Sequence, residues 1–258
     1  MANSAEAIPA LDLGLAPYLP VQELQGRLRA AVLGGAIPGV LLLLEHEAVI
    51  TLGTRAGAHD LRPPVGAAPQ LSDGAIPAGS DCADSLGSEG EPLHDVPVVR
   101  SERGGQATLH APGQLVSYPI MPIEGHDLRA YVCSLEEILM ILLDELGVKA
   151  HRRSGRPGLY VRDEKIASVG LRCRRWVASH GTSLNVSVDL SLFDRIVSCG
   201  EPDLRQTSLD ILTGRSFPMA EIKARYIEAA CRVFGWKLMS LRALTFDVVE
   251  KWLGLPGC

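Results

Sequence analysis

The sequence feature that most constrains the fold is a strict alternation of apolar and polar residues in two runs, 167–174 and 184–189. The segment Ser179-His180-Gly181 lies between them. Successive side chains of an extended chain point to opposite faces of a sheet. The two runs therefore predict antiparallel strands, each with one buried face, and we expect a turn near 179–181.

A second pattern, between residues 127 and 146, predicts the clearest helix in the chain. Its apolar residues recur at spacings of three and four, as they do on the buried face of a helix. Asp127 can cap the start of this helix, and Gly147 suits the left-handed residue at its end. Cys133, in the middle, is expected to pack in the core. The recurring apolar residues are Leu128, Tyr131, Val132, Leu135, Ile138, Leu139, Leu142, Leu143 and Leu146.

Helices mixed with hairpins predict an α/β or α+β fold built on one main sheet, and we expect residues 1–258 to form a single domain. Shorter patterns predict the remaining helices and strands. They predict helices over 20–33 and 218–234, a strand over 40–44 with 48–52 as its hairpin partner, a strand over 115–120 and a short helix near 246–253.

Residues 62–98 interrupt the domain with a different composition. They contain six prolines, five glycines, six acids and one base, Arg62. Such a segment cannot bury enough apolar surface to offset its ordering entropy, so we expect a long mobile loop. It carries a charge of −5, which equals the net charge of the whole chain. The rest of the chain is therefore close to neutral, which argues against a general nucleic-acid binder.

The six cysteines form no C-x-x-C pair and no cluster with zinc-ligand spacing, so we expect reduced thiols and no metal site. The N-terminus lacks the pattern of a secretory signal, and no arginine precedes Arg27. No purely apolar stretch, 40–44 included, is long enough to cross a bilayer. We therefore expect a cytoplasmic protein without a membrane partner.

Four local motifs carry candidate chemistry. A glycine pair, as in the first motif, lets the backbone pass close to a ligand. A cysteine on a Gly/Pro-bounded loop, as in the fourth, can be an exposed nucleophile. Each motif alone also has a plain structural explanation: a tight turn, a solvated lysine, a turn with a polar strand face, and a buried thiol. The motifs span residues 103–114, 165–170, 179–186 and 196–202.

Together, the four motifs resemble the signature of the lipoyl(octanoyl) transferases. That family has an RGG-x-x-TYHGPGQ loop, a K-I-A-S-[IV]-G strand, an HG-x-x-LN-V turn and a Cys-Gly pair, which correspond here to Arg103–Gln114, Lys165–Gly170, His180–Val186 and Cys199-Gly200. Leu109 stands where the family has tyrosine, and Ala111 where it has glycine. The resemblance implies a fold like the biotin/lipoyl protein ligase catalytic domain, a mixed sheet flanked by helices.

The resemblance also implies an activity and the residues that carry it. The enzyme would transfer an octanoyl group from octanoyl-acyl carrier protein to a lysine of lipoyl domains, in 2-oxoacid dehydrogenases and in the glycine cleavage H protein, without a cofactor. Cys199 and Lys165 would be catalytic. The implied substrate-binding residues are Arg103, Gly104, Gly105, Gln106, Ala107, Thr108, Leu109, His110, Ser168, Val169, Gly170, Gly181, Thr182 and Ser183.

A cysteine and a lysine suit this chemistry. A thiolate forms a thioester similar in energy to the one it attacks, and a nearby ammonium favours the thiolate over the thiol. We hypothesise that Lys165 acts so on Cys199 and later accepts the proton of the attacking amine. Gly200 or the Gly104–Gly105 loop would donate N–H groups to the tetrahedral intermediate. Three alternatives remain: a lipoate–protein ligase or a lipoyl amidotransferase of related fold, and a non-catalytic relative that binds acyl-carrier or lipoyl domains.

A basic segment suggests how protein partners are recognised. Residues 149–175 contain nine lysines and arginines against two acids, Asp163 and Glu164. A local excess of positive charge steers acidic proteins. Because acyl carrier proteins and many lipoyl domains are acidic, we predict that this segment attracts them.

Overall fold

The computed structural model describes residues 8–62, 96–236 and 242–243. Among them, eight strands form one mixed sheet in the order β11-β1-β2-β6-β10-β9-β8-β7. Strands β1 and β2 pair in parallel, whereas β2, β6, β10, β9, β8 and β7 follow one another antiparallel. The strands are β1 (Ala10–Ala16), β2 (Val40–His46), β6 (Gln114–Ile120), β7 (His151–Arg153), β8 (Arg156–Val161), β9 (Glu164–Arg174), β10 (Val177–Asn185) and β11 (Arg242–Ala243).

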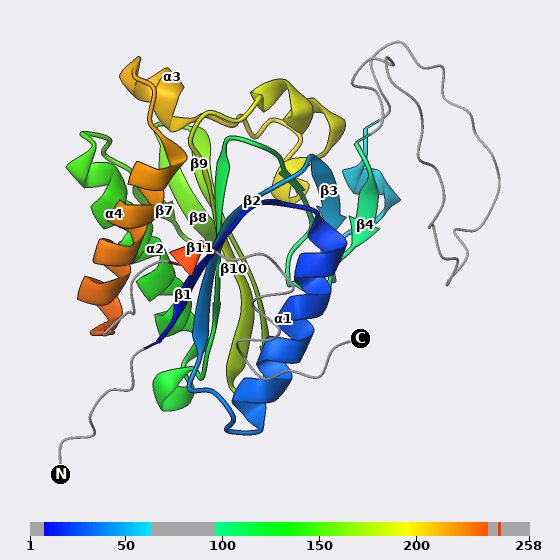
Figure 1. Ribbon diagram of the computed structural model, residues 1–258. Coiled ribbons are helices and arrows are strands. Elements are labelled where there is room, and N and C mark those ends of the chain that lie inside the picture. The colour runs from blue at the N-terminus through cyan, green and yellow to red at the C-terminus, as the bar shows by residue number, and fades with distance from the viewer. Residues whose placement is uncertain (1–7, 63–95, 237–241, 244–258) are drawn as a thin grey trace.

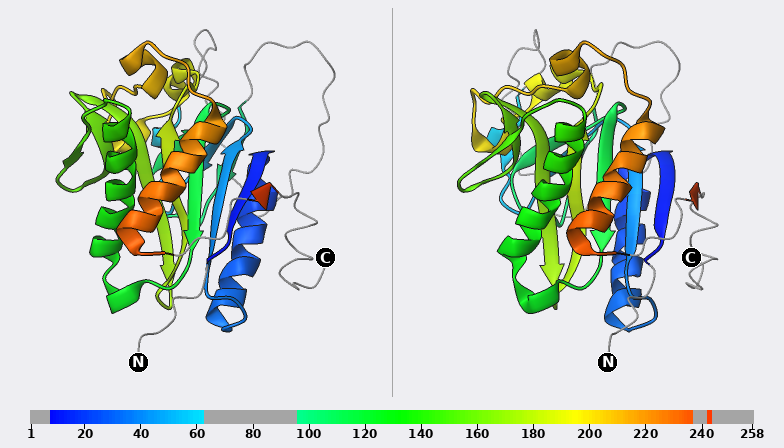
Figure 2. Two further views of the ribbon diagram at one scale, coloured as in Figure 1. Left: turned by 60° about the vertical axis from the view of Figure 1, so that its left-hand side comes forward. Right: turned by 90° about the vertical axis from the view of Figure 1, so that its left-hand side faces the viewer.

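Helices cover both faces of this sheet (Figures 1 and 2). Helix α1 (Tyr18–Leu33) packs on one face, and α2 (Leu128–Glu145) and α4 (Met219–Phe234) lie side by side on the other. Two short 3-10 segments, η2 (Glu124–His126) and η3 (Leu190–Arg195), and the short helix α3 (Leu209–Thr213) connect the larger elements. The predicted fold class, a mixed sheet flanked by helices, is confirmed.

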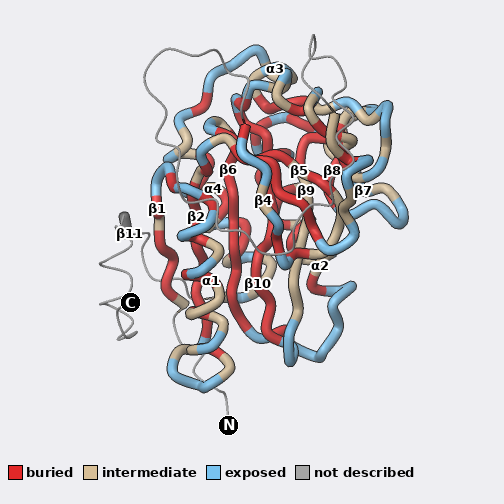
Figure 3. Tube along the Cα trace, turned by 90° about the vertical axis from the view of Figure 1, so that its right-hand side faces the viewer, coloured by how far each residue is buried: buried red, intermediate tan, exposed pale blue. Residues whose placement is uncertain are grey.

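Strand β10 departs from the predicted pattern. Its nine residues are all buried, so it has no polar face in solvent (Figure 3). The reason is that α1 covers one side of β10 and α2 the other. Ser179-His180-Gly181 lies inside this strand, and the turn falls earlier, between Arg174 and Val177. The predictions of one buried face for this strand and of a turn at 179–181 are therefore wrong.

A second, three-stranded sheet contains β3 (Val49–Leu52), β4 (Val98–Arg100) and β5 (Ala107–His110) in the order β4-β3-β5. The predicted hairpin between 40–44 and 48–52 is wrong, because β3 pairs with β4 and β5 instead of β2. Both edges of β2 are already occupied, by β1 and by β6. The chain therefore leaves the main sheet after His46 and starts a separate layer, which carries the loop 101–106.

Helix α2 begins and ends where the sequence predicts. The carboxylate of Asp127 accepts hydrogen bonds from the N–H groups of Arg129 and Ala130, and Gly147 has a left-handed φ of +84°. Cys133, however, is exposed and not part of the core. Helix α4 ends at Gly235, whose φ is +65°, in agreement with the predicted boundary.

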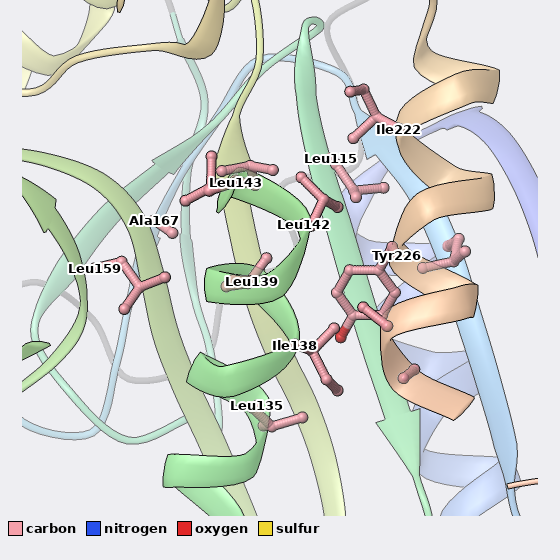
Figure 4. Close-up of a cluster of buried hydrophobic side chains, with 14 of the residues drawn as sticks. Leu115, Leu135, Ile138, Leu139, Leu142, Leu143, Leu159, Ala167, Ile222 and Tyr226 are labelled. Carbon is pink, nitrogen blue, oxygen red and sulfur yellow. The ribbon is translucent and has the colours of Figure 1, made fainter. Parts of the chain in front are cut away.

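The largest hydrophobic cluster lies between α2, α4 and the sheet (Figure 4). Leu135, Leu139 and Leu142 of α2 are fully buried, and Tyr226 of α4 packs beside them and hydrogen-bonds Ser117 of β6. Truncating a buried leucine costs about 2–5 kcal/mol. This packing holds β6, β9 and β10 in register, and these strands carry one wall of the candidate site.

Part of the predicted insert and the predicted helix near 246–253 lie outside the described residues. The end of the insert is described: Val96 is buried and β4 begins at Val98, so the last residues of the predicted insert belong to the second sheet and its core. Among the described residues, no helix has the length and apolarity needed to span a membrane.

Candidate active site

Lys165 is buried at the start of β9, with 2% of its surface exposed. Its Nζ donates to the sulfur of Cys199 over 3.0 Å and to the carbonyl oxygen of Pro157 over 3.2 Å. Gly158, at φ +120°, leaves room for this side chain, since a Cβ there would lie 2.8 Å from the Lys165 Cε. Lys165 is therefore not the solvated hairpin lysine that its position beside Asp163 and Glu164 allows.

Cys199 is presented by a strained loop, the 3-10 segment η4 (Ser198–Gly200). Its φ of +57° is left-handed, a conformation that costs an ordinary L residue roughly 1–2 kcal/mol. The segment η1 (Ala58–Asp60) supports the loop, because the Asp60 carbonyl accepts from the N–H of Val197 over 2.8 Å. The cysteine loop is therefore anchored by a segment that is distant in the sequence.

The backbone around Lys165 ties the two catalytic candidates together. The N–H of Lys165 donates to the carbonyl of Arg205, and the N–H of Thr207 donates to the carbonyl of Lys165, both over 2.9 Å. The segment that follows the cysteine loop thus runs along β9. Lys165 and Cys199, which are 34 residues apart in the sequence, are therefore joined by a hydrogen bond in the folded chain.

One cavity joins these two residues to almost all of the predicted substrate-binding residues. It lies between the loop 103–108 and strands β9 and β10. Its walls combine backbone edges at glycine positions with small side chains, which suits a slender ligand. The predicted residues that line it with Cys199 and Lys165 are Arg103, Gly104, Gly105, Gln106, Ala107, Thr108, His110, Ser168, Val169, Gly170, Gly181, Thr182 and Ser183.

Leu109 is the exception among the predicted substrate-binding residues. The alternation of β5 points Thr108 and His110 into the cavity and Leu109 away from it. Leu109 is fully buried in a separate cluster with Ile50 and Phe193. Leucine at this position therefore fills the small core beneath the second sheet and does not shape the cavity.

Tyr118 and His180 also line the cavity, although neither is among the predicted substrate-binding residues. Tyr118 lies in β6, where every residue is buried and no motif marks it. His180 lies in the motif 179–186, whose polar residues His180, Thr182 and Asn185 the sequence offers as possible pocket residues. Its φ is +57°, and its N–H donates to the side-chain oxygen of Gln25 on α1. This left-handed residue turns the ring toward the cavity.

Arg103 forms the base of the glycine-rich loop. It is 7% exposed, and its guanidinium donates to the hydroxyl and the carbonyl oxygen of Thr51 and to the carbonyl oxygen of Gly104. Burial lowers the pKa of Arg103 from its ordinary value. A Cβ at Gly170 would lie 3.1 Å from its Cδ, so the glycine of β9 lets the arginine side chain pass. Arg103 therefore fixes the glycine-rich loop beside the cavity.

Three buried histidines, His46, His110 and His180, which we call the histidine floor, lie at or behind the end of the cavity away from Cys199. The Nδ1 of His46 donates to the Ala16 carbonyl, so its Nε2 accepts from the Tyr118 hydroxyl, both over 2.9 Å. Burial lowers the pKa of His46 to about 4, and burial with the charge of Arg103 lowers that of His180 to about 3. Burial also lowers the pKa of His110 well below its ordinary value. The floor is therefore uncharged at neutral pH.

The sequence of this chain is similar to those of known proteins. The family model "Lipoyl protein ligase A/B catalytic domain" matches residues 17–231 of this chain. The chain belongs to this family. An octanoyltransferase from Syntrophotalea carbinolica is 38% identical over 84% of this chain and 89% of its own length. An octanoyltransferase from Rubrobacter xylanophilus is 38% identical over 88% of this chain and 95% of its own length. The prediction of a lipoyl(octanoyl) transferase is confirmed by these relatives.

Solved structures of lower sequence identity share the fold. A lipoate-protein ligase A bound with ATP superposes with a TM-score of 0.69 at 12% identity, covering 96% of this chain and 92% of that one. A putative lipoate protein ligase from Thermoplasma acidophilum with bound lipoic acid gives a TM-score of 0.64 with the same coverage. The predicted ligase-like catalytic fold is therefore confirmed.

The structure narrows the choice of oxyanion donors in this transferase. The N–H of Gly104 donates to the Leu171 carbonyl, and the N–H of Gly200 donates to the Val197 carbonyl. Of the three candidates, Gly105 alone makes no backbone N–H hydrogen bond to another described residue. Its φ of +94° is one that only glycine adopts readily. No group of three or more potential metal ligands occurs in the described part of the chain.

The basic segment 149–175 is less free than its composition suggests. Arg152 pairs with Glu136 and Glu137, Arg153 with Asp163, and Arg156 with Glu201. Lys149 pairs with Asp144, Arg172 with Glu102, and Lys165 is buried. The positive field that the sequence predicts is thus largely compensated by acids from other elements.

Proposed function

We propose that this transferase moves an octanoyl group from octanoyl-acyl carrier protein to a lysine of lipoyl domains, through an octanoyl thioester on Cys199. The 3.0 Å contact between the Lys165 Nζ and the Cys199 Sγ, inside the cavity lined by the motif residues, is the observation that carries this proposal. The cavity would hold the acyl chain, with the carbonyl carbon at Cys199 and the alkyl end toward the histidine floor.

In the first half-reaction the ammonium of Lys165 stabilises the thiolate of Cys199. The thiolate attacks the donor's thioester carbonyl, and the new C–S bond forms as the donor's C–S bond breaks. Lys165 gives its proton to the departing donor thiolate, so the products are acyl-Cys199, the donor thiol and an uncharged Lys165. The N–H of Gly105 would hold the oxyanion of the tetrahedral intermediate.

In the second half-reaction the acceptor lysine arrives as an ammonium and must lose a proton before it can attack. The uncharged Lys165 accepts this proton as a general base. The free amine attacks acyl-Cys199, the amide bond forms and the Cys199 thiolate leaves, while the second proton of the amine passes to solvent. The thiolate and the ammonium of Lys165 are then restored.

Intact-protein mass spectrometry tests this proposal. After incubation with an octanoyl thioester the protein should gain one octanoyl group that neutral hydroxylamine removes and that moves to a lipoyl domain when one is added. Cys199→Ser should form no such adduct. The matched control is Cys133→Ser, since this cysteine is exposed but lies outside the cavity. A hydroxylamine-labile adduct that persists in Cys199→Ser would overturn the assignment.

A further inference from the structure

A groove on the surface leads to the reactive pair from the side of α2. It has a volume of about 850 Å³ and lies between the first half of α2 and the tip of the β7–β8 hairpin. Its walls are largely apolar, with Leu128 and Val132 on the helix side and Pro157 on the hairpin side. Leu128 is 40% exposed, so its side chain can contact a molecule that lies in the groove.

The groove is continuous with the cavity that contains the sulfur. Val132, Arg156 and Pro157 line the groove and also line a second cavity of about 470 Å³, which reaches Lys165 and Cys199. The carbonyl oxygen of Pro157 accepts from the same Lys165 Nζ that contacts the sulfur. A chain-like molecule lying in the groove would therefore have its end at the reaction centre.

Some arginines at this surface form ion pairs within the chain, and others do not. The arginines of the hairpin, Arg152, Arg153 and Arg156, are held by ion pairs with acids of this chain. Arg55, which lines the second cavity, and Arg129, which lines the groove, are exposed and form no ion pair with another described residue. The groove therefore has one cation without an ion pair among the described residues, Arg129, and the second cavity, which also contains Cys199, has another, Arg55.

We infer that this groove is the docking site of the donor: an acidic carrier domain whose acyl thioester is borne on a flexible pantetheine arm with one phosphate. This inference rests on the proposed function. The arm is linear and mostly uncharged, which fits apolar walls, and its phosphate and the acidic carrier surface complement Arg129. A donor docked on the groove reaches Cys199 only through the second cavity, so it must deliver its acyl group on a slender arm.

The inference can be tested by comparing two donors in the acylation of Cys199. One donor is octanoyl-acyl carrier protein, and the other is octanoyl N-acetylcysteamine, which has neither the protein nor the phosphate. The double variant L128E/R129E reverses the free charge and removes the exposed apolar side chain. Because acidic residues in the first turn of a helix interact favourably with its dipole, α2 should remain folded.

The matched control is I211E/R215E. It also changes an exposed large apolar residue and an exposed arginine, on α3 and the segment after it, outside the groove. We expect L128E/R129E to lower the acylation rate with the carrier protein about tenfold relative to the rate with the short thioester. The control should leave this ratio unchanged, and added salt should reduce the difference between the two proteins.

Three outcomes would overturn the inference. L128E/R129E could behave like the control with the carrier protein, or it could slow both donors equally, which would indicate damage to the reaction centre. It could instead slow only the transfer from acyl-Cys199 to a lipoyl domain, which would make the groove the acceptor's site. Failure of the unaltered protein to react with either thioester would refute the proposed function itself, and is thus distinguishable from failure of the docking site.

Discussion

The two ends of the active-site cavity differ in how their buried polar side chains are hydrogen-bonded. At one end, Lys165 and Cys199 face each other with few other partners, and the cysteine has a left-handed backbone. At the other end, two rings of the histidine floor are held by hydrogen bonds: His46 bonds Tyr118, and His110 bonds Gln114, which bonds Asn185 in turn. Hydrogen bonds fix the rings of His46 and His110 in place, whereas the Cys199 sulfur has the Lys165 ammonium as a partner that can also exchange a proton with it.

The difference follows from the surrounding elements. Two members of the histidine floor, His46 and His180, lie in β2 and β10 of the main sheet, which helices cover on both sides, and His110 lies in β5 of the second sheet. Cys199 lies on a loop that no strand of the main sheet includes. A loop can place a nucleophile at an opening, but it needs anchors such as the Asp60 carbonyl to hold the sulfur in position.

The largest effect should come from breaking the reactive pair with Lys165→Met, which keeps the volume of the side chain and removes the charge. We expect at least a 100-fold loss of octanoyl transfer, because Lys165 stabilises the thiolate and handles both protons. Alkylation of Cys199 by iodoacetamide at neutral pH should slow about tenfold or more. His110→Gln, a change at the histidine floor, should leave the alkylation rate unchanged. Equal alkylation rates in the Lys165 variant and the unaltered protein would contradict the assigned role.

A smaller effect should appear at the histidine floor when the pH falls. The pKa values of His46 and His180, about 4 and about 3, lie below the ordinary histidine value, so the unfolded chain binds more protons as the pH drops below about 6.5. Stability is therefore lost as the pH falls from 7 to 5, on the order of 1–2 kcal/mol for each histidine. Urea unfolding at the two pH values measures this loss.

The variant His180→Asn isolates one of these contributions. Asparagine tolerates the left-handed backbone of this position and does not titrate. The loss of stability between pH 7 and pH 5 should therefore be smaller in the variant than in the unaltered protein. An identical loss in both would show that His180 is not held uncharged in the folded state.

The smallest effect should come from Gly200→Ala beside the nucleophile. A Cβ there would lie 2.3 Å from the side-chain nitrogen of Gln106, and the φ of +72° adds about 1 kcal/mol of strain. We expect acylation of Cys199 to slow several-fold as the loop shifts. Gly214→Ala is the matched control, because Gly214 has a φ of +65° but open space around it. Gly214→Ala should lose similar stability without slowing acylation. An equal loss of activity in the two variants would show that the contact between Gly200 and Gln106 does not matter for acylation.

Much of the fold follows from local patterns in the sequence. The period of α2, its cap at Asp127 and the left-handed Gly147 predict the helix nearly to the residue. The same patterns fail at β3 and β10, because pairing partners and the number of covered faces depend on elements distant in sequence. The sequence also does not predict that Tyr118 faces the cavity or that Leu109 is buried away from it. Only the register of the strands decides which side chains line the cavity.

The sequence by itself determined the family, the type of sheet and the residues able to do the chemistry, because periodicity and motifs are local properties of the chain. The tertiary structure alone decided that the Lys165 ammonium reaches the sulfur of Cys199, that the arginines of 149–175 are mostly paired, and that Arg55 and Arg129 form no ion pair with another described residue. Distances and charge compensation depend on how separate segments pack against one another, which no local pattern specifies.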